Sequence, residues 1–269
     1  MTRIRLTLCE RRNFDIGRYK DKYIKRRIAL RLRANRVGSA GEYCELLQRS
    51  EVELDLLVKA LTIHVSQFFR NLPTFEKLRQ EVLPLLFNNA AHQRRETLTF
   101  WSVGCASGEE PYSLAMLLST WFAGELARFK VSVVATDVNP DILEAARRGV
   151  YDSERLREAP ADLVAHMFTP VGERYQLRPE IRQMVDFRQG DIFDEASFTE
   201  SDLILCRNLL IYFDRPVQEQ IIHGLATALR TDGILVLGKA ESLVGGTRRR
   251  FTTVCPIERI YQKSRLSLS

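Results

Sequence analysis

The sequence predicts an α/β fold in which an all-helical N-terminal domain precedes a parallel sheet covered by helices. Two observations predict it. The first 72 residues carry only helical patterns, and from about residue 98 short β-branched runs alternate with helical stretches. The composition, with 45% hydrophobic and 28% charged residues among 269, is that of a folded globular chain. A chain of this length holds one domain of roughly 190 residues and a second, smaller one.

The N-terminal domain carries the excess positive charge. Its first 70 residues hold 16 of the 40 Lys and Arg residues but only 8 of the 34 Asp and Glu residues, so the net charge of +6 originates there. Nine bases lie in the range 18–36 against a single acid, Asp21. As a helix, this range places Ile24, Ile28 and Leu32 on one apolar stripe and the bases elsewhere. The basic face is either a solvated helix surface or a docking surface for an acidic partner, which could be a nucleic acid or a protein helix.

Short amphipathic helices complete the N-terminal domain. Apolar residues recur at helical spacing over 42–61, after a break at 37–41, and a connecting helix follows Pro73 until the polar stretch 88–96 ends it. We therefore expect a domain of residues 1–72 and a second domain of residues 73–269.

The second domain reads as alternating strands and helices. The expected strands are 98–103, 130–137, 184–191, 202–208 and 233–239, with two more in 249–263, and the expected helices are 109–123, 140–148 and 215–230. Such alternation indicates a parallel sheet, and sheets of this kind bind ligands at the carboxyl ends of their strands. Residues 152–183 interrupt the alternation and are too long for a turn, so we expect a small inserted subdomain there.

Several classes of protein are disfavoured. The five cysteines form no CxxC pair and the four histidines show no ligand spacing, so neither a disulfide framework nor a metal site is expected. No apolar run approaches the roughly 18 residues of a membrane span, and the N-terminus lacks the long apolar stretch of a secretory signal. We expect a cytoplasmic protein with reduced thiols. Nothing in the sequence indicates an oligomer, so a monomer is the expectation.

The loop after the first expected strand has the residues of a ligand site. Gly104 and Gly108 frame it, and Glu109 and Glu110 open the next helix. Glycines let a ligand approach the backbone, and free N–H groups at a helix start favour an electronegative group. The G-x-x-x-G spacing is not that of a dinucleotide site, and no Gly-Lys-Ser/Thr follows. Two glutamates would repel a pyrophosphate and suit a cationic ligand.

Further polar residues follow the other expected strands. Asp137 ends the second strand, where an acid can accept hydrogen bonds from ribose hydroxyls, and Asp191 ends the third. Arg207, Asn208 and Tyr212 follow the fourth. A glycine loop, a ribose-binding acid and no phosphate clamp together indicate a nucleoside that carries positive charge, and S-adenosylmethionine fits this description.

Four strings give the chain a family resemblance. SQFFRN, SVGCASGEEPYSLAM, VVATDVNPDILEAARRGVY and LILCRNLLIYFDRPVQEQII resemble the CheR family of chemotaxis receptor methyltransferases, which esterify glutamate side chains of methyl-accepting chemotaxis proteins. The resemblance covers nearly the whole chain. It implies a Rossmann-like class I S-adenosylmethionine-dependent methyltransferase sheet, an all-helical N-terminal domain and a small inserted β-subdomain. The cofactor implied is S-adenosyl-L-methionine, with S-adenosyl-L-homocysteine as product.

The resemblance also implies roles for individual residues. The family's N-x-T-x-F-F-R segment, which binds the cofactor, aligns with His64, Ser66 and Arg70, although His64 stands in place of the usual Asn. Glu110 corresponds to the ligand of the cofactor's amino end, with Glu109 as second choice. The remaining implied cofactor contacts are Asp137 at the ribose, Asp191 and Ile192 at the adenine, and Arg207 and Asn208 at the methyl donor.

Arg70 and Tyr212 are the implied catalytic residues, the first positioning by charge and the second lying beside the transferred methyl. For each site residue the competing interpretation is an ordinary capping or strand-end polar group. A substrate glutamate, with a pKa near 4.3, is ionised at neutral pH and needs no general base. Catalysis is then expected to come mainly from holding the reacting atoms in line.

Partners follow from the same resemblance. The basic range 18–36 is expected to dock on the Glu-rich helices of chemoreceptors. In some CheR members the inserted subdomain binds a receptor-tail peptide through a glycine-rich loop. Here 168–180 contains one glycine, Gly172, so independence from such a tether is expected. The alternatives are an RNA methyltransferase, disfavoured because no N-P-P-Y or D-P-P-Y motif occurs and few aromatics interleave the bases, and a binding module without catalysis.

Overall fold

The computed structural model describes residues 1–62 and 66–264, which fall into two compact units. The first comprises Met1–His64 with Ile211–Gln218, and the second comprises Val65–Leu210 with Glu219–Ser269. This division comes earlier in the chain than the expected boundary after residue 72. It also groups Ile211–Gln218 with the helical unit, which the sequence did not indicate. This grouping results from direct hydrogen bonds, since Lys20 donates to the carbonyls of both Ile211 and Tyr212.

The helical unit consists of short helices around an aliphatic core. Its elements are α1 (Thr2–Arg12), a 3-10 turn (Ile16–Arg18), α2 (Asp21–Ala34), α3 (Ala40–Arg49) and α4 (Glu51–Leu61). Ser39 and Ser50 accept the backbone N–H groups of Glu42 and Glu53, so both helices begin with a side-chain cap. On α2 the expected stripe is confirmed, because Ile24 and Ile28 are buried and Leu32 is half-buried.

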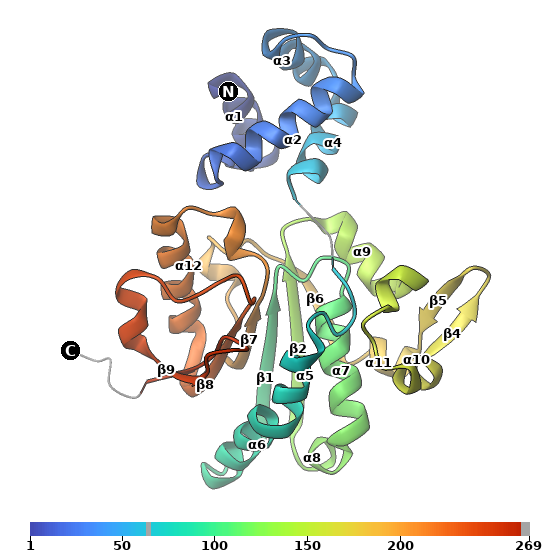
Figure 1. Cartoon of the computed structure of the whole chain (residues 1–269), viewed down its shortest axis with the longest axis vertical. Helices are drawn as coiled ribbons and strands as arrows, with labels where there is room; N and C mark the ends of the chain where they lie inside the picture. The colour runs from blue at the N-terminus through green and yellow to red at the C-terminus, as the bar shows by residue number, and fades with distance from the viewer. Residues whose placement is uncertain (63–65, 265–269) are drawn as a thin grey trace. The chain divides into compact units, whose positions relative to one another are not determined.

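The second unit is built on a mixed sheet, shown in Figure 1. Within residues 66–264 the sheet has seven strands in the order β6-β2-β1-β7-β8-β10-β9. The strands are β1 (Thr97–Val103), β2 (Lys130–Asp137), β6 (Val185–Gln189), β7 (Ser201–Cys206), β8 (Leu229–Leu237), β9 (Phe251–Cys255) and β10 (Ile260–Lys263). The neighbouring strands β6, β2, β1, β7 and β8 pair in parallel, and β10 is antiparallel to both of its neighbours, β8 and β9. The predicted α/β class is therefore confirmed.

The strand order places a candidate ligand site. It reverses at β1, with β2 and β6 on one side and β7 and β8 on the other. Parallel strands end at the same edge, so the carboxyl ends of β1 and β7 form the switch point at which open sheets bind ligands.

Helices flank the sheet, and all but α8 lie close to their predicted positions; α8 follows the expected helix 109–123 and was not predicted. They are α5 (Leu72–Lys77), a π-helical turn (Leu78–Val82), α6 (Leu83–His92), α7 (Glu109–Trp121), α8 (Ala123–Arg128), α9 (Pro140–Arg148) and α12 (Arg215–Ala228). The local signals explain the match for α9: Asn139 caps it by accepting the N–H groups of Asp141 and Ile142, and Gly149, at φ 63°, ends it. None of the helices in the described residues has the length and apolar character that a membrane span requires.

The inserted subdomain contains helices as well as strands. An antiparallel sheet in the order β3-β5-β4 is formed by β3 (Val150–Asp152), β4 (Phe168–Val171) and β5 (Arg174–Leu177). A 3-10 turn (Ser153–Leu156), α10 (Ala161–Met167) and α11 (Pro179–Arg182) complete it. The subdomain begins with β3, slightly before the expected start at residue 152. Gly172, at φ 61°, lies in the tight turn of the β4–β5 hairpin, visible at the right of Figure 1.

Candidate functional site

The glycine loop at the end of β1 owes its two glycines to conformation and packing. Gly104 and Gly108 have φ of 66° and 90°, values that L side chains rarely adopt. A Cβ on Gly108 would lie 3.0 Å from the Phe187 ring and 3.1 Å from Ala146, and one on Gly104 would lie 3.1 Å from Leu209. The expectation that the glycines leave room for a ligand is therefore incomplete, because neighbouring side chains of the protein already require them.

Asp137 lies at the end of β2 and holds this loop in place. It is 7% exposed, and one carboxylate oxygen accepts the Ala106 N–H while the other accepts the Asn139 N–H, both at 3.0 Å. A carboxylate oxygen has room for more than one donor, so both the structural role and a ribose contact are chemically open to it. The Gly190 N–H donates to the Asp137 carbonyl and ties the end of β6 to that of β2.

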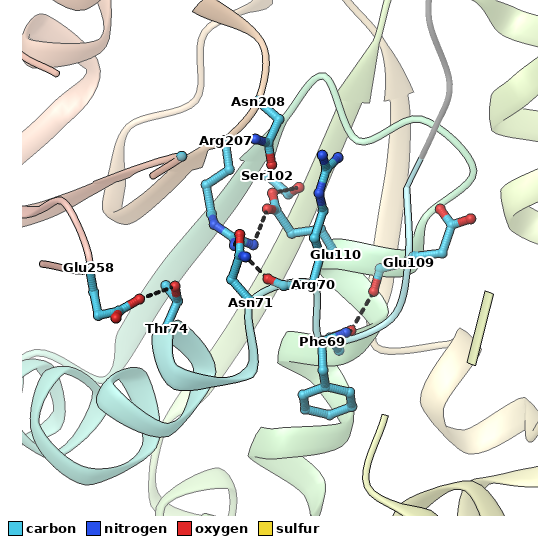
Figure 2. A network of polar contacts seen from close by, with 12 residues as sticks. Phe69, Arg70, Asn71, Thr74, Ser102, Glu109, Glu110, Arg207, Asn208 and Glu258 are labelled. Atoms are coloured by element: carbon cyan, nitrogen blue, oxygen red, sulfur yellow. Dashed lines mark hydrogen bonds and ion pairs between the residues drawn. The ribbon is translucent and has the colours of Figure 1, made fainter. Parts of the chain in front are cut away.

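Glu110 and Arg207 form an ion pair between the ends of β1 and β7, in which Arg207 is buried and Glu110 is half-buried (Figure 2). Arg207 Nη1 lies 3.1 Å from one Glu110 oxygen, and the Ser102 hydroxyl donates to the other at 2.8 Å. Side-chain exposure is 2% for Arg207 and 13% for Glu110. Glu110 and Arg207, both predicted to contact the cofactor, thus pair with each other, and the Glu110 side chain remains partly accessible.

Arg207 also fixes the segment that carries Arg70. Its Nη2 donates to the Arg70 carbonyl at 2.6 Å and to Asn71 Oδ1 at 3.3 Å, while the guanidinium lies over the Phe75 ring at 5.4 Å. Phe69 and Asn71, on either side of Arg70, have φ of 54° and 62°. Two non-glycine residues in the left-handed region require strong support from their surroundings, and such conformations concentrate at functional sites.

Asn208 has the same unusual conformation and a carboxylate that supports it. Its φ is 59°, and its N–H donates to Glu241 at 2.9 Å. The same oxygen of Glu241 accepts the Gly238 N–H at 2.6 Å. Glu241 is buried and joins the ends of β7 and β8. Sequence reasoning missed it, and the available signal was an acid three residues after a glycine at the end of a predicted strand.

Glu109, the second choice for the cofactor's amino end, is entirely buried. Its Oε1 accepts from the Ser107 hydroxyl at 2.7 Å and lies 3.3 Å from Arg155 Nη1. Its Oε2 has no hydrogen-bond partner among the described residues. Burial raises the pKa of Glu109, with hydrogen bonds from Ser107 and Ser66 acting in the opposite direction. Glu109 is thus surrounded by protein groups, while Glu110 is the more accessible of the pair.

The remaining predicted residues lie in different parts of the chain. Asp191 accepts the Phe193 N–H at 3.0 Å, directly after β6, and Ile192 lines a cavity of about 130 Å³ together with Phe198 and Gly224. His64 lies outside the described residues. Tyr212 belongs to the helical unit.

The Tyr212 segment is bound to the start of α2 within the helical unit. The Tyr212 ring lies 5.0 Å from the Tyr23 ring, and its carbonyl accepts the Lys20 N–H at 2.9 Å. Phe213 lies 4.8 Å from the Tyr19 ring. The residues brought together in the second unit are therefore Arg70, Glu110, Arg207 and Asn208 at one end, and Asp137 and Asp191 at the other, without Tyr212.

Comparisons with known proteins agree with this architecture. The family model described as CheR methyltransferase, SAM binding domain, matches residues 64–258, and that described as CheR methyltransferase, all-alpha domain, matches residues 1–62. The chain is 34% identical over 230 residues to the chemotaxis protein methyltransferase of Listeria monocytogenes, covering 86% of this chain and 85% of that protein. It is 36% identical over 241 residues to chemotaxis protein methyltransferase 2 of Pseudomonas aeruginosa, covering 86% and 81%.

A third relative is much longer. The chain is 36% identical over 249 residues to an uncharacterized 104.1 kDa protein in the hypE 3' region of Rhodobacter capsulatus. The match covers 92% of this chain but only 26% of that protein. Proteins similar to this chain therefore occur both at about its own length and as parts of larger chains.

Proposed function

Because the chain belongs to the CheR methyltransferase family, we propose that it is a protein-glutamate O-methyltransferase. It transfers the methyl group of S-adenosylmethionine to glutamate side chains of methyl-accepting chemotaxis receptors. The observation that carries the proposal is the Glu110–Arg207 ion pair, with Arg207 buried, at the switch point of the sheet, within the segment that matches the family's SAM binding domain. Receptor substrates are supported by the names of the Listeria and Pseudomonas relatives.

The donor set fits S-adenosylmethionine. Glu110, Asp137 and Asp191 place carboxylates after three neighbouring strands, which suits the ammonium, ribose hydroxyl and adenine amino groups of that molecule. Ser66, Ile192, Arg207 and Asn208 complete the proposed binding set, together with His64, which lies outside the described residues. When bound, S-adenosylmethionine supplies an electrophilic methyl group on a sulfonium.

The protein's own task is then to position an anion. The substrate carboxylate is already ionised at neutral pH, so no side chain has to remove a proton from it. Positive and negative charge disappear together as methyl moves, so a site that limits water favours the reaction. In our proposal Arg70 directs the substrate carboxylate by charge, and Tyr212 orients the reacting groups by its ring or hydroxyl.

Docking is proposed to use the basic face of α2. Five of its bases, or bases just beyond its end, are exposed: Lys22, Lys25, Arg26, Arg33 and Arg36. Their charge suits the Glu-rich cytoplasmic helices of a receptor, and a receptor substrate of this kind would place the enzyme in the cytoplasm. We propose a monomer, since nothing in the sequence indicates an oligomer. The short β4–β5 turn with its single glycine, Gly172, supports independence from a receptor-tail peptide.

A labelling experiment tests the proposal. The full chain is incubated with S-adenosylmethionine carrying a labelled methyl, and with either receptor cytoplasmic fragments or RNA. We expect label in the receptor fragment that base treatment releases, as hydrolysis of a methyl ester requires, and no label in a fragment whose glutamates are replaced by alanine. Label in RNA, base-stable label in protein, or binding of the cofactor without any transfer would contradict the proposal. The last outcome would identify a binding module.

A further inference from the structure

The inserted subdomain contacts both chain segments that frame one end of the candidate site. Arg155, in the 3-10 turn after β3, donates through Nη1 to the Ser66 carbonyl at 2.5 Å, and its own carbonyl accepts the Phe68 N–H at 2.9 Å. Tyr151, in β3, donates its hydroxyl to the Ser107 carbonyl at 2.7 Å. One short stretch of the insertion therefore binds both the segment 66–68 and the glycine loop.

Glu109 connects these contacts at the start of α7. Arg155 Nη1 lies 3.3 Å from its Oε1, which also accepts the Ser107 hydroxyl. The Glu109 carbonyl accepts the Ser113 hydroxyl at 2.6 Å, and the Ser113 oxygen accepts the Phe69 N–H at 2.8 Å. The positive φ of Phe69 and the course of the backbone toward Arg70 are thus held from the insertion side through Glu109 and Ser113.

Aromatic packing reinforces the same junction. Phe68 is completely buried and meets the rings of Tyr151 and Phe168 edge-on, at centroid distances of 4.7 Å and 5.1 Å. Edge-to-face pairs at these distances are favourable beyond the area they bury. The insertion is therefore integrated with the segment 66–71 by packing as well as by polar contacts, unlike an appended module that touches the core at its ends.

We propose that Arg155 is a positioning residue of the inserted subdomain, which orders the cofactor-binding segment 66–70 by joining Ser66 to the buried Glu109. The inference rests on the proposed function only in taking this segment as part of the S-adenosylmethionine site. A cationic side chain is needed because Glu109 is fully buried and one of its oxygens has no partner among the described residues. Without Arg155, an ionised Glu109 would lose the cation that forms an ion pair with it within the described residues.

Binding of S-adenosylhomocysteine, measured by calorimetry on the full chain, tests this directly. Arg155→Gln should weaken binding about tenfold, as loss of one partner of a buried ionic group does, while Arg155→Lys should recover part of it. Arg174→Gln is the matched control, because Arg174 lies in the same subdomain, has Asp152 as its ion-pair partner within the described residues and is largely exposed. We expect control binding within about twofold of the unmodified protein.

A double-mutant cycle separates positioning from general loss of structure. If Arg155 acts through Glu109, then Glu109→Gln should reduce the effect of Arg155→Gln, because the buried charge that needs a cation is gone. Additive effects of the two substitutions, or equal weakening by Arg155→Gln and Arg174→Gln, would overturn the proposal. Because the readout is binding of the product molecule, these results stand apart from the receptor-methylation test. A chain that binds S-adenosylhomocysteine normally but fails to methylate receptors would sink the proposed function and leave this inference standing.

Discussion

Glu53 in the helical unit and Glu109 in the second unit are both buried, but their surroundings are opposite. In the helical unit Glu53, 4% exposed, accepts from Arg31 Nε at 3.0 Å and Nη2 at 2.5 Å, and from the Tyr43 hydroxyl at 2.6 Å. In the second unit Glu109 has hydrogen bonds from Ser107 and Ser66 and a more distant Arg155, but one of its oxygens has no partner among the described residues. One acid is saturated with donors and the other is not.

The pKa directions follow this difference. Burial acts to raise the pKa of both acids, but at Glu53 the hydrogen bonds from Arg31, Tyr43 and Asn35 together outweigh it and lower the pKa. At Glu109 burial prevails and the pKa is raised. A buried carboxylate whose oxygens all accept hydrogen bonds stabilises the folded state, whereas one with an oxygen left without a donor reduces stability. Groups of the second kind concentrate at functional sites. The comparison therefore separates an acid that serves folding from one that serves the site.

The largest expected effect comes from breaking the saturated network. Glu53→Ala leaves the buried Tyr43 hydroxyl and the Arg31 guanidinium without their acceptor, so the free energy of unfolding should fall by about 3 kcal/mol. Denaturant unfolding of the full chain followed by circular dichroism measures it. Glu45→Ala is the control, since the Glu45–Arg49 pair is exposed and should contribute little. Equal losses in the two variants would refute the assignment of Glu53 as a stabilising acid.

Asp137 lies between the two cases, because each of its oxygens accepts one backbone N–H at the carboxyl end of β2. If it also binds the ribose, Asp137→Asn should weaken S-adenosylhomocysteine binding by roughly 10- to 100-fold, or about 1.5–3 kcal/mol, as loss of hydrogen bonds to a charged group implies. Asp186→Asn, at an exposed position on β6, controls for charge. Affinity within twofold of the unmodified protein would assign Asp137 to loop support alone.

Local features were predictable from the sequence because their causes are local. The predicted bounds of β2 and α9 coincide with the observed ones, since a β-branched run and the capping signals of Asn139 and Gly149 lie within the elements themselves. The candidate site was predictable to the extent that parallel strands bring Asp137, Asp191 and Arg207 to one edge. The contacts of Arg155 with Ser66 and Glu109, and that of Glu241 with Asn208, were not predictable, because these partners are distant in sequence. Nor does any local pattern group Ile211–Gln218 with the helical unit.

The pH dependence of stability should differ in sign between the two acids. For Glu109 the unfolded chain releases its proton near the ordinary value of 4.5, while the folded chain retains it to a higher pH. The folded state then binds more protons, so the free energy of unfolding falls as pH rises between those two values. For Glu53, whose pKa is lowered, the contribution is present above the ordinary value and is lost as pH falls through the folded one.

Glu109→Gln isolates this contribution. It should remove the decrease in stability above pH 4.5 and raise the free energy of unfolding at neutral pH by on the order of 1 kcal/mol, because an amide is cheaper to bury than a carboxylate. Thermal unfolding over a pH series measures it, with Glu53→Gln as the comparison that should instead lose stability at neutral pH. A parallel pH profile for Glu109→Gln and the unmodified protein would show that Glu109 keeps an ordinary pKa.

The smallest effect on stability is expected for the exposed bases of α2, which form no buried network. Reversing Lys25, Arg26 and Arg33 to Glu should leave the unfolding transition nearly unchanged, since exposed charges contribute little to the fold. The KM for receptor fragments should rise severalfold and its dependence on ionic strength should flatten, because the attraction being screened is removed. Initial rates at several salt concentrations measure both quantities.

A charge-matched control decides whether position or net charge is responsible. Arg3, Arg49 and Lys59 are equally exposed but lie on the other helices of the same unit, so their reversal changes the net charge by the same amount. If docking uses α2, only the α2 reversal raises the KM substantially. If both triple variants raise it equally, the receptor responds to the overall positive field of the helical unit. An unchanged KM in the α2 variant would exclude this face, and the bases would then be a solvated helix surface.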